Sequence, residues 1–502
     1  MTIGSRSRPR AQLPLLAVLG TFAVLGAFAC DAPAPQAAPG VLPDTTAVAA
    51  PPADSLLLDS LALADGGLAG SPPAGDVAPG AAIDSVAAAA LAGARITPGR
   101  AVGPEDFEVG VTPVDPSQRV PRPERVRALY VNAWSAGSSA RMNALIGIAN
   151  RTEINTFVVD IKEADGQVTY RSSIPMVRRV GANTMRPIRD VGGLLARLRE
   201  NGIYPIARIV VFKDPVLAIA RPDWAIRTAE ERIWRDHNRE VWVDPYNANV
   251  WEYNLALARE AVALGFAEVQ WDYVRFPDVP SAYMRTAVYA AREGRSRAEA
   301  IREFLRYTRE QLGPEGVPVT ADVFGVSTSA SHDVGIGQHW ESMSDVTDVL
   351  LPMVYPSHYP RGSFGIRHPN ADPYHTVFTA LRHAVRRNRV IENAATIRPW
   401  LQDFTLGQPP YGPAHVRAQI RAVYDAGLDE WVLWNASSRY TVGALADPEG
   451  DVPDIEGLAE LITRSDTTGV PADTIGIPEA PPLPDDTAPA KQPLGTPMEK
   501  PR

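Results

Sequence analysis

Short apolar segments rich in β-branched residues recur along the middle of the chain, and turn-forming residues bound each of them. Polar residues are rare within them; residues 349–354, for example, are interrupted only by Pro352. Such runs are typical of strands buried on both faces of a parallel sheet. The pattern predicts eight strands, at Arg127–Trp134, Thr156–Glu163, Tyr204–Phe212, Glu268–Phe276, Pro318–Gly325, Asp348–Pro356, Ala395–Phe404 and Glu430–Ala436.

Most of the intervals between these strands carry apolar residues at helical spacing. In residues 250–265 the apolar stripe runs from Trp251 to Val262, and Gly265 ends the pattern. Similar helices are predicted at Met142–Asn150, Val191–Asn201, Arg297–Gly313, Thr376–Asn388 and Ala414–Gly427. A strand–helix alternation repeated eight times predicts an α/β fold, a single (β/α)8 TIM barrel.

The two ends of the chain differ from this central block in composition. Residues 31–120 are dominated by Ala, Pro, Gly and Asp, whereas all ten Trp residues fall between Trp134 and Trp434. A segment with so few large apolar side chains cannot offset its conformational entropy by burial. We therefore expect residues 31–120 to be a disordered Ala/Pro-rich linker, residues 121–465 the barrel domain and residues 466–502 a disordered Pro-rich tail.

Residues 1–30 have the order of an export signal. Three arginines precede an apolar run from Leu13 to Ala29, and Cys30, the only cysteine, follows it. A lipoprotein signal leaves an acylated Cys at this place, so we expect lipidation at Cys30 and a membrane-anchored lipoprotein of the cell envelope. Two alternatives stay open: Ala27-Phe28-Ala29 as the cleavage site of a secreted protein, and an uncleaved membrane anchor.

Charge and missing motifs narrow the possible functions. The formal net charge of -9 argues against a nucleic-acid partner, which would need a basic surface. The eight His residues form no H-x-H pair on the first strand and no H-E-x-x-H motif, and no G-x-S-x-G motif occurs. We therefore expect no metal and no cofactor, and acid–base chemistry by carboxylates remains.

Two carboxylates are predicted at neighbouring strand ends, where the active site of a β/α-barrel lies. Asp272 falls on the same face as Gln270 by the two-residue strand period, and Asp322 takes the neighbouring position on the fifth strand. Two acids on neighbouring strand ends can lie close enough to act together in the hydrolysis of a glycosidic bond. The structural alternatives are a salt bridge from Asp272 to Arg275 and a capping role for Asp322.

A set of motifs in order resembles the bacterial putative glycosyl-hydrolase family, a domain with a predicted TIM barrel that is distantly similar to α-amylase and α-galactosidase barrels. The motifs are VDIKEADG (159–166), WVDPYN (242–247), QWDYVRFP (270–277), ADVFG (321–325), LPMVYPSHY (351–359) and RPWLQDF (398–404). The resemblance covers about residues 125–461. In the relatives a strand-four Asp is the nucleophile, which the resemblance places at Asp272. We assign the general acid/base to Asp322, with Glu163 or Asp403 as alternatives.

Several further polar residues are candidates for substrate binding. Asp160 and Lys162 are expected on one face of the second strand and Arg208 on the third, where cations hold carboxylates ionised, or where a buried ion pair serves the fold alone. Asp244 either binds substrate or initiates a turn before Pro245. The remaining polar candidates are Arg275, His358, Gln402 and Asn435.

Aromatic residues near strand ends are candidate sugar platforms, because an aromatic face stacks on the apolar face of a sugar. We expect Trp400 and Trp434 to have this role, with Tyr355 among the binding residues, and Trp271 to face the helices because it is out of phase with Asp272. The other aromatics near strand ends are Trp134 and Tyr359. Some of these rings are expected to be core.

These observations together predict a glycoside hydrolase that acts on a cell-envelope or extracellular polysaccharide or oligosaccharide. A non-catalytic carbohydrate-binding barrel would keep the aromatic platforms without needing two acids of divergent pKa. A scaffold of envelope assembly is a third hypothesis, which a large exposed apolar patch would favour.

Overall fold

The structure, a computed structural model, describes residues 101–463. Eight runs of parallel strand alternate with helices, which confirms the predicted TIM barrel. The strands are β1 (Arg127–Val131), β2 (Thr156–Lys162), β3 (Tyr204–Val210), β4 (Glu268–Asp272), β5 (Val319–Phe324), β6 (Val349–Met353), β7 (Thr396–Ile397), β8 (Trp400–Gln402) and β9 (Trp431–Trp434).

The barrel closes through β5 and β6. The order β5-β4-β3-β2-β1-β9-β8-β6-β7 has an additional pairing of β5 with β6, so the sheet has no free edge at that place. The seventh predicted strand is divided into β7 and β8, which both pair with β6. The division falls at Arg398 and Pro399, and a proline cannot donate a ladder hydrogen bond.

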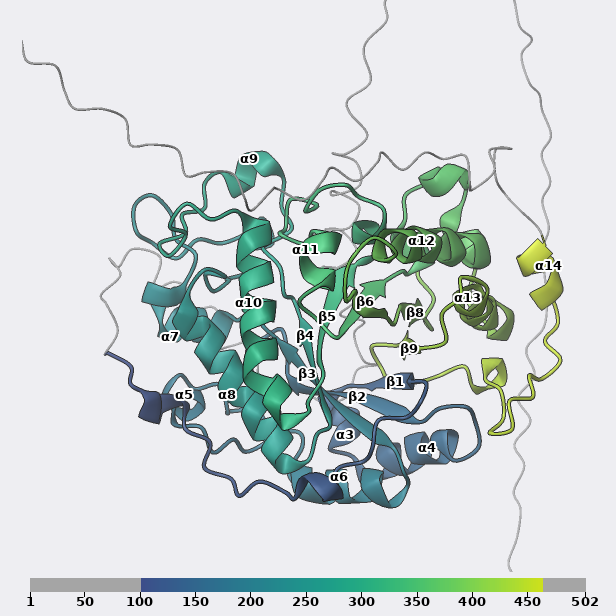
Figure 1. The fold of residues 1–502 in the computed structure, drawn as a ribbon, viewed down its shortest axis with the longest axis horizontal. Coiled ribbons are helices and arrows are strands. Elements are labelled where there is room, and N and C mark those ends of the chain that lie inside the picture. Colours follow the sequence, from purple (N-terminus) through teal and green to yellow (C-terminus); the bar gives the residue numbers. More distant parts are fainter. Residues whose placement is uncertain (1–100, 464–502) are drawn as a thin grey trace, which may run out of the picture. The chain divides into compact units, whose positions relative to one another are not determined.

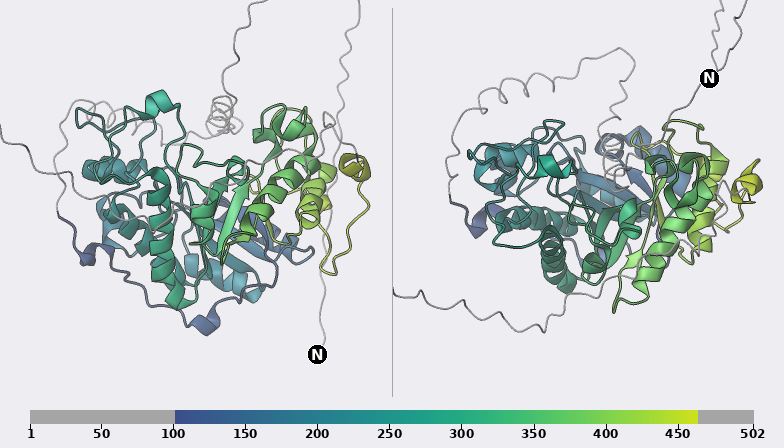
Figure 2. Two further views of the ribbon diagram at one scale, coloured as in Figure 1. Left: turned by 45° about the horizontal axis from the view of Figure 1, so that its top comes forward. Right: turned by 90° about the horizontal axis from the view of Figure 1, so that it is seen from above.

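Helices surround the strands (Figures 1 and 2). The long helices α8 and α10 contact β3, β4 and β5, and α13 contacts β8. The helices are α3 (Ala133–Ala136), α4 (Ser139–Ala149), α5 (Pro175–Arg179), α6 (Val191–Glu200), α7 (Pro215–Ala220), α8 (Ala248–Leu264), α9 (Ser281–Met284), α10 (Arg297–Leu312), α11 (Trp340–Ser344), α12 (Pro373–Asn388), α13 (Pro413–Asp425) and α14 (Leu458–Thr463).

Local signals in the sequence set the ends of the long helices. Helix α8 begins after Asn247, whose side chain accepts a hydrogen bond from the backbone of Asn249, and ends at Gly265 with φ of 117°. Helix α10 begins with a capping box between Ser296 and Glu299. The predicted helix bounds therefore agree with the structure to within a few residues.

The barrel has two apolar layers. Side chains pointing outward from the strands, such as Phe157 and Trp271, pack against the helices, whereas inward side chains such as Val158, Ile206 and Leu351 fill the interior. This alternation is the two-residue strand period expressed in a closed sheet. Polar side chains in the interior therefore lie in a dry environment and need partners.

Residues 101–120 pack against the barrel, although composition placed them in the linker. Asp106 in the 3-10 helix η1 (Pro104–Phe107) forms an ion pair with Arg179 of α5, and the backbone N–H of Val114 donates to the carbonyl of Ala263 at 2.8 Å. A backbone hydrogen bond and a single ion pair do not change the amino-acid composition of a segment, so composition could not predict these contacts. Among the described residues, 101–120 therefore pack with the barrel rather than apart from it.

The predicted signal segment with Cys30, residues 31–100 of the predicted linker and the whole predicted tail, residues 466–502, lie outside the described residues. Within residues 101–463, no helix combines the length and apolar character that crossing a membrane requires.

Candidate active site

Ionisable side chains from neighbouring strands meet at the carboxyl ends of β2 to β5. The strand register places Asp160 beside Arg208, and Asp272, the last residue of β4, beside Val210 of β3. On β5, Asp322 lies two residues before the strand end. Because the strands are parallel, these positions share one mouth of the barrel.

Arg208 is the centre of this group. Its guanidinium forms ion pairs with Asp160 on one side and Asp272 on the other, and its Nε atom lies 3.0 Å from Oδ2 of Asp272 and 3.9 Å from Oδ2 of Asp322. Burial opposes the charge on Arg208, but the carboxylates of Asp160 and Asp272 hold its pKa above the ordinary value. The Oδ2 atoms of Asp272 and Asp322 therefore lie beside the same nitrogen atom, and the distance between them is no greater than the sum of these two distances.

Asp272 has a fixed orientation and some access to solvent. Its Oδ1 accepts the backbone N–H of Tyr273 at 2.6 Å, while Oδ2 is held by Arg208. Its side chain is 10% exposed, against 1% for Asp322 and 3% for Asp160. Of the three acids bound around Arg208, Asp272 is therefore the most accessible to a substrate.

Asp322 is buried beneath it. Oδ1 accepts the indole N–H of Trp400 at 2.7 Å, and the side-chain amide of Gln270 donates at 2.9 Å to the same oxygen. Burial and then the charge of Asp272 raise the pKa of Asp322 well above its ordinary value. Within the described residues Oε1 of Gln270 has no hydrogen-bond partner, while the amide nitrogen of the same side chain donates to Asp322.

Glu163 lies just beyond the end of β2 and is half-buried. Burial and then the charge of Asp160 raise its pKa to about 8, with a smaller contribution from Asp165, while Arg208 and the backbone N–H of Ala133 act in the opposite direction. Its carboxyl group is therefore mostly protonated at neutral pH.

Aromatic side chains form the other half of the mouth, at the ends of β1, β6, β8 and β9. Trp434 is partly exposed, and its ring centroid lies 5.7 Å from that of Tyr355 and 6.2 Å from that of Tyr130. Trp400 is only 2% exposed, so its ring presents little surface to a ligand and its indole N–H supports Asp322. The rings of Phe404 and His358 lie beside this group.

The remaining candidates near β8 and β9 hold the loops together. Asp403 accepts the backbone N–H and the hydroxyl of Thr441, at 2.8 and 2.6 Å. Burial raises the pKa of Asp403, and these hydrogen bonds oppose the shift. Gln402 accepts the backbone N–H of Ser357 at 3.1 Å, and Asn435 donates to the carbonyl of Asp403 at 2.6 Å.

Lys162 does not share a face with Asp160, so that prediction is wrong. The register of β2 against β3 shifts between the two residues, which interrupts the two-residue alternation and leaves Lys162 facing outward. Its Nζ atom lies 2.8 Å from Asp214 and donates to Asn254 of α8 at 3.3 Å, and the side chain is fully buried. Lys162 thus ties β2 to the helices.

Three other predicted residues lie apart from the Arg208 group. Asp244 accepts the backbone N–H of Tyr246 at 3.0 Å, as a turn-initiating Asp does, and burial raises its pKa to about 6. Arg275 is buried, with its guanidinium 4.7 to 5.2 Å from the ring centroids of Phe324, Tyr273 and Trp242. Trp271 faces the helices as expected, donating to Thr308 of α10 at 3.2 Å.

Sequence reasoning missed Tyr130 as a site residue. Its hydroxyl donates to Asp160, and its ring lies 5.6 Å from the guanidinium carbon of Arg208. Tyr130 joins the acidic and aromatic halves of the mouth. A strict count along β1 would have placed it inward, in the phase of Ala128, which lies in the inner apolar layer.

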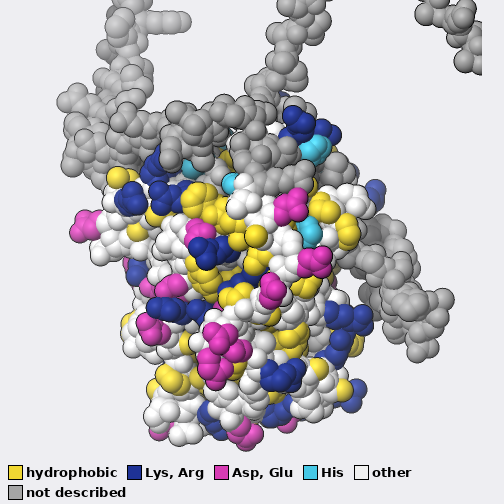
Figure 3. Space-filling view, turned by 90° about the vertical axis from the view of Figure 1, so that its right-hand side faces the viewer, with side chains coloured by type: hydrophobic (Ala, Val, Ile, Leu, Met, Phe, Trp, Pro, Cys, Tyr) yellow, Lys and Arg dark blue, Asp and Glu magenta, His cyan; other side chains and the backbone are white. Residues whose placement is uncertain are grey.

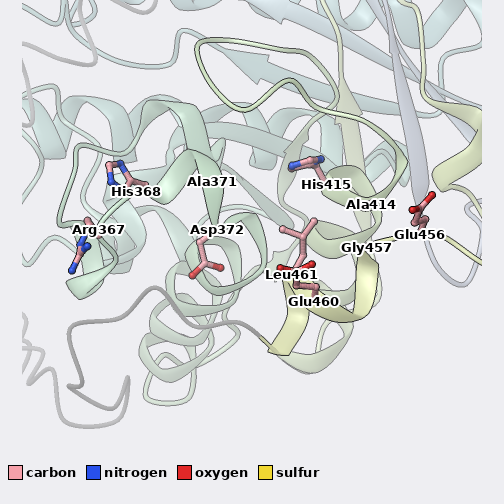
Figure 4. A pocket seen from close by; sticks show the side chains of 10 residues that line it. All are labelled: Arg367, His368, Ala371, Asp372, Ala414, His415, Glu456, Gly457, Glu460 and Leu461. Carbon is pink, nitrogen blue, oxygen red and sulfur yellow. The ribbon is translucent and has the colours of Figure 1, made fainter.

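A cavity of about 610 Å³ lies elsewhere, lined by the segment just before α12, the first turn of α13 and residues at the start of α14 (Figure 4). Its lining includes His368, Asp372, His415 and Glu460, and none of the residues bound to Arg208. On the face that carries α13 and α14, acidic, basic and apolar side chains are interspersed (Figure 3). Within residues 101–463 no group of three or more His, Cys, Asp or Glu side chains is arranged to hold a metal ion.

Comparison with known proteins gives one family match. Residues 128–440 match the model of a family described as "putative glycosyl hydrolase domain". No curated protein matches the chain. A hypothetical protein from Ruminiclostridium thermocellum is 42% identical over 39% of this chain and 97% of its own, with a TM-score of 0.36.

Two further solved structures are similar at low identity. The PgaB (BpsB) glycoside hydrolase domain from Bordetella bronchiseptica is 14% identical, over 62% of this chain and 95% of its own, with a TM-score of 0.44. An alpha-galactosidase from Thermus thermophilus is 16% identical, over 69% of this chain and 63% of its own, with a TM-score of 0.39.

Proposed function

We propose, from the premise that this chain belongs to the putative glycosyl hydrolase domain family, that it hydrolyses glycosidic bonds of a cell-envelope or extracellular polysaccharide. One observation carries the proposal: Asp272 and Asp322, from adjacent strands, face the same guanidinium nitrogen at the barrel mouth. Two carboxylates in different environments are what glycoside hydrolysis uses. The aromatic half of the mouth supports a sugar ligand.

Asp272 is the nucleophile in this proposal. It ends β4, the position of the nucleophile in the α-amylase and α-galactosidase barrels that the motifs resemble, and its orientation is fixed by Arg208 and Tyr273. A carboxylate nucleophile gives two displacements at the anomeric carbon and so retains its configuration. Proton NMR of the first-formed product should therefore show the anomer of the substrate, and an inverted product would exclude this role for Asp272.

Asp322 is one candidate for the proton donor, because burial and then the charge of Asp272 raise its pKa well above the ordinary value. Its 1% exposure counts against direct contact with a glycosidic oxygen. Asp403 is less suited, since both of its oxygens accept hydrogen bonds from Thr441. Glu163 is the third candidate.

The test is release of reducing ends from a panel of polysaccharides by the wild type, D272N and D429N. Asp429 is an exposed acid just before β9, at the amino end of the strands, so D429N is the matched control. We expect D272N to lose at least about 10³-fold in kcat/KM and D429N to keep full activity.

A non-catalytic carbohydrate-binding barrel predicts a different result. Such a protein would bind one of the same polysaccharides in a pull-down assay, and D272N would change at most the affinity. Binding without any release of reducing ends by the wild type would therefore contradict the hydrolase proposal and favour the binding module.

We further propose that the protein is exported and anchored to a membrane through an acylated Cys30. The support is the order of arginines, apolar run and single Cys in residues 6–30. Radiolabelled palmitate should be incorporated into the wild type and not into C30A. Unlabelled protein in the medium would favour a secreted form, and unlabelled protein in the membrane fraction an uncleaved anchor.

A further inference from the structure

We infer that the leaving-group side of the active site is formed by Glu163, as the proton donor, and Trp134, as the platform for the departing sugar. The inference rests on the proposed glycoside hydrolase function and adds to it the two residues that handle the bond being broken. It is carried by the position of Glu163 beside the Arg208 group and by the exposure of Trp134.

Glu163 is held at the mouth without being fixed in an ion pair. Its backbone closes a short turn after β2, with its N–H donating to Gln167 at 3.1 Å and its carbonyl accepting from Gly166 at 3.0 Å. Within the described residues its carboxyl group forms no ion pair, whereas Asp160 and Asp272 are both bound to Arg208. The Glu163 side chain is therefore positioned by its backbone and remains available to a substrate.

The charges around Glu163 suit a proton donor. Burial, and then Asp160 of β2 and Asp165 of the turn, favour its neutral form, while Arg208 of β3 and the backbone N–H of Ala133 favour the charged form. The pKa of about 8 keeps the proton at neutral pH and still allows it to leave when charge develops on the glycosidic oxygen. Glu163 is half-buried, so a substrate can reach its carboxyl group, whereas the Asp322 side chain is only 1% exposed.

Trp134 stands out among the tryptophans by its exposure. It is 64% exposed, whereas Trp224, Trp234, Trp242, Trp271, Trp340, Trp400 and Trp431 are each at most 2% exposed. It lies in α3, directly after β1, and follows Ala133, whose backbone N–H faces the Glu163 carboxyl group. An exposed indole at a barrel mouth is a surface on which a sugar ring stacks.

In the proposed step, a carboxylate oxygen of Asp272 attacks the anomeric carbon as the bond from that carbon to the glycosidic oxygen breaks. The proton of Glu163 moves to the glycosidic oxygen, and the sugar on Trp134 leaves as an alcohol. Water then attacks the anomeric carbon, gives a proton to Glu163 and displaces Asp272 as a carboxylate. The sum is one water consumed and one glycosidic bond hydrolysed.

The experiment compares two substrates: the polysaccharide that the wild type cleaves, and the 2,4-dinitrophenyl glycoside of the sugar that becomes the new reducing end. Dinitrophenolate leaves without protonation, so it does not need the acid. We expect E163Q to lose about 10²- to 10⁴-fold in kcat/KM on the polysaccharide, and much less on the dinitrophenyl glycoside. The fall of wild-type kcat/KM above about pH 8 should disappear in E163Q.

Trp134→Ala should raise KM for the polysaccharide about tenfold with kcat nearly unchanged, and should leave the dinitrophenyl glycoside unaffected. Glu124→Gln, at a glutamate whose side chain is 89% exposed before β1, is the matched control for E163Q. Circular dichroism and thermal melting check that each variant is folded.

The outcomes separate this inference from the proposed function. If D272N abolishes both activities but E163Q slows both substrates equally, or keeps the alkaline limb, Glu163 is not the proton donor and the hydrolase proposal stands. An unchanged KM in W134A would show that Trp134 is not the platform for the departing sugar. If the wild type cleaves neither substrate, the proposed function and this inference fall together.

Discussion

Arg208 determines the chemistry of the barrel mouth at the scale of single residues. Its one guanidinium lies between carboxylates from three strands, so it offsets part of the cost of placing them close together in a buried site. The same arrangement gives the acids different environments, with the Asp272 side chain 10% exposed and that of Asp322 only 1% exposed. Divergent environments of this kind let two carboxylates take different roles in one reaction.

A buried histidine predicts how stability depends on pH. His383 of α12 is 5% exposed and hydrogen-bonded to the hydroxyl of Ser329 at 2.8 Å; burial, then Arg386 and Arg387, lower its pKa from 6.5 to about 4. The unfolded chain therefore binds a proton between pH 6.5 and 4 that the folded protein does not. This contribution to stability is complete above pH 6.5 and is lost as the pH falls towards 4, by about 3 kcal/mol.

Urea unfolding of the wild type and H383Q from pH 4 to 8 checks this expectation. The difference between their free energies of unfolding should shift in favour of the variant below pH 6.5, because glutamine does not titrate. A difference that stays constant over this range would show that His383 has the same pKa in the folded protein as in the unfolded chain, which would contradict the expected shift.

At the scale of elements, two glycines end the long helices in different ways. Gly265, after α8, has φ of 117°, a left-handed conformation that an L side chain adopts only with strain. Gly313, after α10, has φ of -57°, and a Cβ there would meet no atom within 4 Å. Glycine is therefore required by the backbone conformation at the end of α8, whereas the backbone at the end of α10 would also accept alanine.

Alanine substitution should separate these two cases. We expect G265A to lower the free energy of unfolding by about 1 kcal/mol or more, because alanine is strained at positive φ. G313A should leave stability unchanged or raise it by up to about 1 kcal/mol, since alanine restricts the unfolded chain. Chemical denaturation of both variants measures the difference, and equal losses would contradict the assignment of distinct helix ends.

At the scale of the whole molecule, a buried ion network lies at the amino ends of the strands, opposite the candidate active site. Arg398, between β7 and β8, is fully buried and reaches Glu268 of β4 at 2.5 Å and Glu430, just before β9, at 2.9 Å. Burial opposes its charge, but the two glutamates raise the pKa of Arg398 above its ordinary value. The network joins strands that lie far apart in the sequence.

Removing the shared cation should therefore destabilise the whole barrel. We expect R398M to lose about 3–5 kcal/mol of unfolding free energy, because two carboxylates stay buried without their partner. R125M is the control: Arg125 pairs with Asp429, next to Glu430, at 3.1 Å, with both side chains more than half exposed, and should cost less than about 1 kcal/mol. Denaturant unfolding of both variants compares them, and equal losses would show that the buried ion network contributes no more than a surface pair.

The sequence by itself determined the barrel and the strand ends at which its acids lie. The eight apolar runs and the period of two are local properties, and parallel strands share one mouth, so Asp272, Asp322, Asp160 and Arg208 could be placed there together. Trp271 was placed among the helices by the same count.

Only the tertiary structure decided what each of these side chains contacts. A shift in strand register that no local pattern marks places Lys162 against Asn254 of α8, about ninety residues away in the sequence. The exposure of a side chain depends on neighbours from many elements. Packing buries Trp400 and raises the pKa of Glu163, whereas Trp134 is left exposed to solvent. Periodicity fixes the direction of a side chain along its own strand, whereas access, partners and charge depend on the packing of the whole barrel.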